Sequence, residues 1–79
     1  MHVELRLYAS LQKFLPGDSV DNPRLVEMEE GTTVRNLLEK FQIPFEAPKI
    51  IFLNGIHARG DEVLKDGDRV DVYEMLGGG

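Results

Sequence analysis

The sequence predicts an α+β fold in which helices pack on one face of a mixed β-sheet. Three observations support this prediction. Apolar and polar residues alternate, with the period of a half-buried strand, near both ends of the chain, in His2–Tyr8 and Arg69–Met75. Between them, a longer segment repeats its apolar residues at helical spacing. The chain has only 79 residues, which suits a single domain with one core, and therefore one layer of helices on one sheet.

The N-terminal third predicts two strands joined by a short helix and a loop. His2–Tyr8 is the first strand, and Ala9–Leu15 has the apolar spacing of a short helix that ends at Pro16 and Gly17. A polar, turn-forming loop follows as far as Pro23. Alternation then resumes in Arg24–Glu30, which we expect to form a second strand that pairs back on the first. Its glutamates indicate a solvated edge, where charge discourages pairing with another sheet.

The clearest helix begins after Gly31. Thr33 is placed to cap it, and its apolar residues then follow at the spacing i, i+3, i+4 and i+7, in a single stripe of Val34, Leu37, Leu38 and Phe41. Proline disfavours helix at its own position and at the residue before it, so we expect the helix to stop at Ile43 and Pro44. A stripe this regular indicates packing against the sheet.

The second half predicts three strands joined by tight turns. After an irregular connection in Phe45–Lys49, the continuously apolar Ile50–Leu53 is expected to form a strand covered on both faces or lying beside a partner. Asn54-Gly55 predicts a type I′ hairpin turn into the short strand Ile56–Ala58.

A second tight turn, at Asp66-Gly67, leads into the last strand, Arg69–Met75. In that strand the alternation directs Val70 and Val72 inward, and it directs Asp71, Tyr73 and Met75 outward. The first and last strands both reach the centre of the sheet most simply as parallel neighbours. This arrangement is the β-grasp, or ubiquitin-like, fold. We expect it to span residues 1–76 and to be followed by a flexible glycine tail at residues 77–79.

The composition narrows the classes of function. A net charge of -5 argues against nucleic acid, which binds through Lys and Arg. No apolar run approaches the length of a membrane span, so we expect a cytoplasmic protein. The absence of cysteine excludes a thiol nucleophile and thiolate metal sites. His2 and His57 lie far apart in sequence, so we expect both to be exposed strand residues and not metal ligands. We also expect no metal site, no bound cofactor and no free-standing enzyme.

The last three residues, Gly77, Gly78 and Gly79, do not stabilise a fold, because glycine has no side chain to pack and loses the most freedom on ordering. Such a tail is either a frayed terminus or a functional one. Fully extended, it projects a carboxylate about 10 Å and is thin enough to enter a narrow channel. A terminal carboxylate, with a pKa of about 3.3 to 3.7, is an anion at pH 7 and needs activation before it reacts as an acyl group.

Taken together, these segments resemble the MoaD/ThiS family of ubiquitin-like sulfur carriers. The resemblance covers essentially the whole chain, and it rests on VELRLYASLQKFLP, GTTVRNLLEKF followed by IP, IFLNGIH, LKDGDRV and the glycine terminus. The long loop to Pro23 is more similar to the MoaD branch, the small subunits of molybdopterin synthase, than to ThiS. Two features depart from the usual pattern, namely a third glycine and the absence of proline in Glu74-Met75-Leu76.

The resemblance implies that the carboxylate of Gly79 is the functional group, with Gly77 and Gly78 threading into a partner. The implied partners are an adenylyltransferase related to ubiquitin-activating enzymes, which uses ATP and a sulfur donor, and the large subunit of molybdopterin synthase or an equivalent acceptor enzyme. The product is a thiocarboxylate that donates sulfur in molybdopterin biosynthesis.

Other acceptors remain open. They are the thiazole of thiamine, another sulfur-containing metabolite, and lysines of other proteins, to which a ubiquitin-like modifier is joined through Gly79. A non-covalent β-grasp binding module is a further alternative.

A docking partner is expected to contact outward residues near the tail. Tyrosine, phenylalanine and methionine are enriched at the centres of interfaces. We therefore predict a partner surface made of Tyr8, Phe52, Tyr73, Met75 and Leu76. Packing on a neighbouring loop accounts equally well for Phe52.

Overall fold

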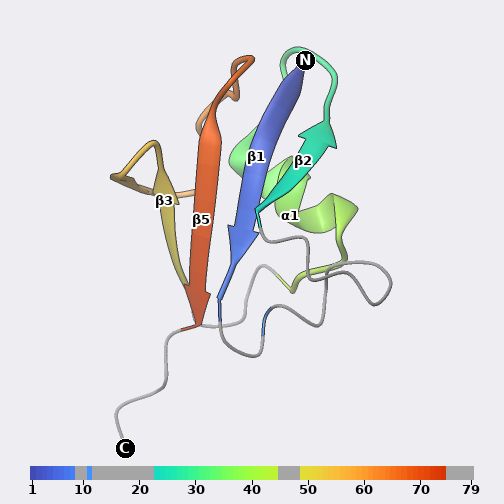
Figure 1. The fold of residues 1–79 in the computed structure, drawn as a ribbon. Helices are drawn as coiled ribbons and strands as arrows, with labels where there is room; N and C mark the ends of the chain where they lie inside the picture. The colour runs from blue at the N-terminus through green and yellow to red at the C-terminus, as the bar shows by residue number, and fades with distance from the viewer. Residues whose placement is uncertain (9–10, 12–22, 45–48, 75–79) are drawn as a thin grey trace, which may run out of the picture.

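The computed structural model describes residues 1–8, 11, 23–44 and 49–74, which form one sheet and one helix (Figure 1). The elements, in chain order, are β1 (His2–Leu7), β2 (Arg24–Glu27), α1 (Val34–Lys40), β3 (Lys49–Leu53), β4 (Ile56–Ala58) and β5 (Arg69–Glu74). Each predicted strand is therefore present, and so is the longer predicted helix.

The five strands form a mixed sheet in the order β2-β1-β5-β3-β4. The first and last strands are parallel neighbours in its middle, with Leu5 opposite Val70 and Leu7 opposite Val72. The other pairs, β1 with β2, β3 with β5 and β3 with β4, are antiparallel. This topology confirms the predicted β-grasp fold.

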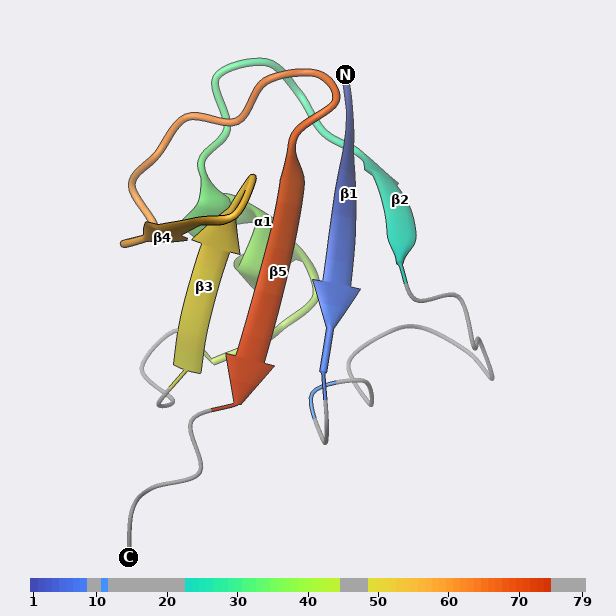
Figure 2. The ribbon, with the colours of Figure 1, turned by 60° about the vertical axis from the view of Figure 1, so that its left-hand side comes forward.

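One face of the sheet is covered by α1, as both views show (Figures 1 and 2). The core between them is apolar and includes the alternating inward residues of the central strands and the helix stripe. Its fully buried members include Val3, Leu5, Leu7, Val34, Leu37, Leu38, Val70 and Val72. The apolar residues that alternate along the strands thus pack against the apolar stripe of the helix.

The helix begins as predicted at an N-cap formed by Thr33. The hydroxyl of Thr33 accepts a hydrogen bond from the backbone N–H of Asn36 at 3.2 Å, and the Asn36 side chain accepts one from the Thr33 N–H at 2.9 Å. This reciprocal pair is a capping box in which Asn replaces the usual Glu or Gln.

The helix ends earlier than predicted, at Lys40. Gln42 adopts a positive φ of 61°, and its N–H donates to the carbonyl of Glu39. The N–H of Ile43 donates to the carbonyl of Leu38 at 3.0 Å. These two bonds form a Schellman motif, which closes the helix before Pro44 can influence it.

The second strand is also shorter than predicted, because β2 ends at Glu27. Met28 still exchanges hydrogen bonds with Met1 in both directions. Beyond it, the carbonyl of Glu29 accepts from the hydroxyl and the backbone N–H of Thr32, which turns the chain toward α1.

The predicted turns are confirmed by their backbone angles. Asn54 and Gly55 have φ values of 52° and 84°, as a type I′ turn requires, and Gly67 has a φ of 89°.

Of the predicted short helix Ala9–Leu15, the structure describes only Leu11, which is buried and donates its N–H to the carbonyl of Tyr8. The rest of that helix, most of the loop as far as Pro23, the connection at 45–48 and the predicted tail lie outside the described residues. No helix in the described ranges is long and apolar enough to cross a membrane.

Candidate functional site

The candidate site lies at the C-terminal end of β5, next to the predicted tail. β1 and β5 end at the same side of the sheet (Figure 1). They are joined there by a hydrogen bond of 3.2 Å from the N–H of Tyr8 to the carbonyl of Val72. Glu74 is the last described residue of β5, so the predicted site residues Met75, Leu76, Gly77, Gly78 and Gly79 lie outside the described part of the chain.

Three of the predicted partner-binding residues come together on the open face of the sheet, opposite α1. The rings of Tyr8 and Tyr73 are stacked, with centroids 4.2 Å apart and planes 5° from parallel. The ring of Phe52 meets Tyr73 edge-on at a centroid distance of 5.8 Å. We call Tyr8, Phe52 and Tyr73 the aromatic cluster.

The sheet register explains how residues from three strands meet. Tyr73 on β5 is opposite Ile50 on β3, so Phe52 lies two residues along β3 on the same face. β1 and β5 run side by side, and Tyr8 follows directly after the last residue of β1. A stacked aromatic pair contributes about 0.5 to 1.5 kcal/mol beyond its buried area. The cluster is therefore a preformed surface, with Tyr73 still 37% exposed.

The stacking partner of Tyr8, Tyr73, has a shifted pKa. A hydrogen bond between the two hydroxyls, with a smaller effect of burial, raises the pKa of Tyr73 above its usual value of 10. The phenol of Tyr73 is thus a neutral hydrogen-bond donor and acceptor at pH 7. His57, predicted to be an exposed strand residue, is exposed and meets Phe52 edge-on at 6.0 Å, which extends the surface onto β4.

Beside the cluster lies a pair of charges that the sequence did not single out. Asp71 alternates outward as predicted, but it is only 3% exposed. Its Oδ2 accepts a hydrogen bond of 3.1 Å from Nε of Arg69, whose side chain is half exposed. In the described structure, Oδ1 of Asp71 and Nε of Arg6 are both buried without a hydrogen-bond partner. Arg6 lies opposite Asp71 in the register between β1 and β5.

The sequence around Asp71 could have indicated that this residue is unusual. An aspartate between Val70 and Val72 stands in the middle of a central strand, where acidic residues are uncommon. Its neighbours on the open face are Arg6 and Phe52, and the helix of the described residues, α1, lies on the other face of the sheet.

The described residues of the site bring together aromatic and charged side chains on the open face. Among them, no group of three His, Asp or Glu side chains could hold a metal ion. The open face combines aromatic rings with the half-exposed guanidinium of Arg69, and tyrosine and arginine are among the side chains that concentrate binding energy in interfaces.

Comparisons with known proteins agree with this architecture. A family model described as Mut7-C ubiquitin matches residues 1–77. Among solved structures, the chain is similar to a putative molybdopterin converting factor, subunit 1, from Pyrococcus furiosus. The two share 25% identity over 95% of this chain and 98% of that one, with a TM-score of 0.73.

The chain is also similar in fold to SAMP1 from Haloferax volcanii, with 17% identity, full coverage of both chains and a TM-score of 0.73. A second structure, of H. volcanii small archaeal modifier protein 1, has a TM-score of 0.75 at the same identity, over 95% of this chain and 98% of that one. A search of the curated proteins gave no match. The predicted resemblance to small ubiquitin-like carriers and modifiers is thus confirmed.

Proposed function

The chain belongs to the Mut7-C ubiquitin family, and on that premise we propose that it is a sulfur carrier activated at the carboxylate of Gly79. The carrier would donate sulfur in molybdopterin biosynthesis, as the small subunit of a molybdopterin synthase. The observation that carries this proposal is the similarity, at 25% identity over nearly the whole of both chains, to a putative molybdopterin converting factor, subunit 1.

The fold supports the proposal by where β5 leads. β5 lies in the middle of the sheet between β1 and β3, so a rigid strand holds the start of the C-terminal segment. Gly79 is five residues beyond Glu74, a reach of at most about 18 Å. A partner that holds the open face could therefore receive Gly79 in an active site at that distance.

The chemistry needs a leaving group that a carboxylate lacks. In the proposed cycle, the Gly79 carboxylate attacks the α-phosphate of ATP and displaces pyrophosphate, which gives an acyl-adenylate. A sulfur donor then displaces AMP, which leaves a thiocarboxylate. Glycine leaves the acyl carbon unshielded, and the partner supplies the ATP site and the groups that stabilise charge.

In this proposal the aromatic cluster is the docking surface for two partner proteins. The first partner is an adenylyltransferase related to ubiquitin-activating enzymes, and the second is the large synthase subunit that accepts sulfur. Tyr8, Phe52 and Tyr73 are rigid, partly exposed rings on one face, which is the composition of interface centres. Met75 and Leu76 are proposed to extend this surface toward the tail.

A reconstituted reaction tests the proposal. The carrier, activating enzyme, ATP, a sulfur donor, the large synthase subunit and the pterin precursor are mixed, and sulfur transfer is measured. Deleting Gly78 and Gly79 is expected to abolish transfer. Tyr73→Ser is expected to raise the KM for the carrier about tenfold, the scale of one interface hot spot. Ile56→Ser is the control, because Ile56 is 73% exposed at the β3–β4 turn, outside the cluster. Full transfer by the deletion variant would refute the proposal.

The alternative that shares this activation chemistry is a ubiquitin-like modifier, in which a lysine of another protein displaces AMP. Mass spectrometry separates the two. Residues 70–79 contain no Lys or Arg, so trypsin would leave the whole segment from Val70 to Gly79 on a modified lysine. Recovery of that branched peptide from cells would favour the modifier, whereas its absence alongside a detected thiocarboxylate would favour the carrier. If neither product is found, a non-covalent binding module is the remaining function.

A further inference from the structure

A second surface lies at the β2 edge of the sheet. Among the described residues, β2 pairs with β1 alone and is an edge strand. Met28 exchanges both backbone hydrogen bonds with Met1, and the peptide groups of an antiparallel strand alternate in direction. Val26 therefore also turns its N–H and C=O toward β1, whereas Leu25 and Glu27 turn theirs outward. Such an unpaired edge is a template for a further strand.

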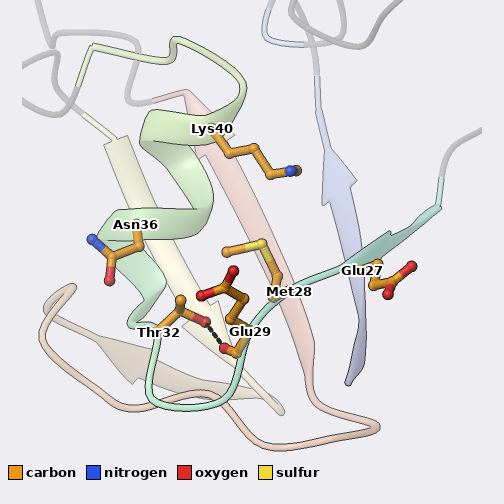
Figure 3. Close-up of a pocket in the computed structure, with 6 residues that line it drawn as sticks. All are labelled: Glu27, Met28, Glu29, Thr32, Asn36 and Lys40. Carbon is orange, nitrogen blue, oxygen red and sulfur yellow. Dashed lines mark hydrogen bonds between the residues drawn. The ribbon is translucent and has the colours of Figure 1, made fainter.

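A groove of about 560 Å³ opens beside this edge, between β2 and α1. Its lining residues are Glu27, Met28, Glu29, Thr32, Asn36 and Lys40 (Figure 3). Figure 3 shows the thioether of Met28 between the strand and the helix, where it forms an apolar floor. A strand added to β2 would direct alternate side chains into this groove and the others toward Leu25, which is 68% exposed.

The groove is charged differently at its two ends. Glu29 lies at the turn beside Thr32, and Glu27, at the end of β2, adds a second carboxylate that points away from Glu29 (Figure 3). Lys40 is the last residue of α1, six residues or about 9 Å along the helix from Val34, and α1 runs back toward the start of β2 (Figure 1). Within the described residues, neither the Lys40 ammonium nor these carboxylates have an ion-pair partner.

We propose that this edge and groove bind an extended segment of a partner protein as a sixth strand. The segment pairs with β2 in antiparallel direction. It carries basic residues at its beginning, facing Glu27 and Glu29, apolar residues over Met28 and Leu25, and acidic residues at its end, facing Lys40. A second copy of this chain fits less well, because each copy has a net charge of -5 and an acidic β2 edge.

This site is separate from the one proposed for the tail. β1 stands between β2 and β5. The groove is lined partly by residues of α1 and so lies on the helix side of the sheet, whereas the aromatic cluster lies on the open face. A carrier could therefore hold an extended segment of one protein while Gly79 occupies the active site of another. The inference goes beyond the proposed function and does not depend on it.

Binding of a synthetic probe tests the proposal. The probe is a capped nine-residue peptide with two lysines, a middle of alternating valine and threonine, and two aspartates. Binding is followed by NMR titration of the isotope-labelled full chain. We expect shifts of the Leu25, Glu27 and Met28 amides, and slowed hydrogen exchange at Leu25 and Glu27. A variant without Gly78 and Gly79 should bind equally well, which separates this test from that of the proposed function.

Charge reversal identifies the groove. Lys40→Glu is expected to weaken binding three- to tenfold, and a probe with lysines in place of its aspartates should restore it. Arg59→Glu is the matched control, since Arg59 follows β4 at the opposite edge of the sheet. Equal effects of the two variants would overturn the proposal.

Backbone pairing is tested separately. Leu25→Pro removes an outward N–H and should abolish binding while the β1–β2 ladder remains. If that variant does not fold, a probe N-methylated at its pairing positions replaces it, with the same expected loss.

Three results would overturn the proposal. The first is no binding at millimolar probe, and the second is protection of the Leu25 and Glu27 amides in the free chain, which would show the edge already covered. The third is a dimer of the wild-type chain that Leu25→Pro makes monomeric, which would assign the edge to a second copy.

Discussion

The two faces of the sheet differ in how their side chains are covered. On the inner face, α1 closes over valines and leucines that are fully buried. On the open face, which no helix of the described residues covers, aromatic rings contact one another and Asp71 is buried beside Arg69. The comparison indicates that the inner face provides most of the stability, whereas the open face holds polar and aromatic groups in place, as the proposed docking role requires.

The largest expected effect separates these roles. Leu37→Ala on the inner face should lower the free energy of unfolding by about 2 to 5 kcal/mol, because it leaves a cavity in a packed core. Tyr73→Ala on the open face should cost about 0.5 to 1.5 kcal/mol, the value of its ring contacts. Urea unfolding followed by circular dichroism measures both. Equal losses would contradict the division between the faces.

The next effect concerns the buried charge. Removing Arg69 should leave the Asp71 carboxylate without a charged donor, at a cost of about 1 to 3 kcal/mol. In an Asp71→Asn background, the same Arg69→Ala change should cost much less. A double-mutant cycle built on unfolding free energies measures the coupling. Additive losses would show that the 3.1 Å contact contributes nothing on the open face.

A smaller effect is expected at the start of the helix that covers the inner face. Thr33→Ala removes the capping hydroxyl and should destabilise the fold by about 1 kcal/mol. Thr33→Ser keeps that hydroxyl and is the control. If the two variants lose equal stability in thermal unfolding, the capping box is not what stabilises this end of α1.

The smallest effect is a pH dependence on the helix side. The N–H groups of Arg59 and Gly60, both 2.7 Å from the Glu62 carboxylate, lower the pKa of Glu62 below its usual 4.5. Because the folded pKa is the lower one, this stabilisation is fully present above the unfolded pKa and is lost as the pH falls through the folded pKa.

Glu62→Gln tests that pH dependence. The variant should be less stable than the wild type at neutral pH, and the difference should shrink in acid, as the pH falls through the lowered pKa of folded Glu62. The urea midpoint measured at both pH values decides the matter. A difference that stays constant with pH would contradict the assignment to the Glu62 charge.

Much of this fold was predictable because local patterns and global topology agree. Alternation located β1 and β5, Asn54-Gly55 located the hairpin, and the limited size of the core led to parallel central strands. The early end of α1 was not predictable, because Gln42 takes a left-handed conformation that usually needs glycine or asparagine.

The candidate site was predictable in part. Outward alternation brought Tyr8, Phe52 and Tyr73 to one face, and the register then made them neighbours. The burial of Asp71 was missed, because alternation gives the face of a residue and says nothing of what long side chains cover on it. The groove beside β2 was also missed. Its lining comes from both β2 and α1, and the periodicity of each segment alone does not show that the two elements lie side by side.

The intact mass of the protein tests the central claim most directly, because it reports on the Gly79 carboxylate itself. The protein purified from its own cells first shows whether the chain ends at Gly79. After incubation with ATP, a sulfur donor and the activating enzyme, we predict a gain of about 16 Da, from exchange of oxygen for sulfur on the activated acyl group. An unchanged mass, under conditions that convert a known sulfur carrier, would contradict the account.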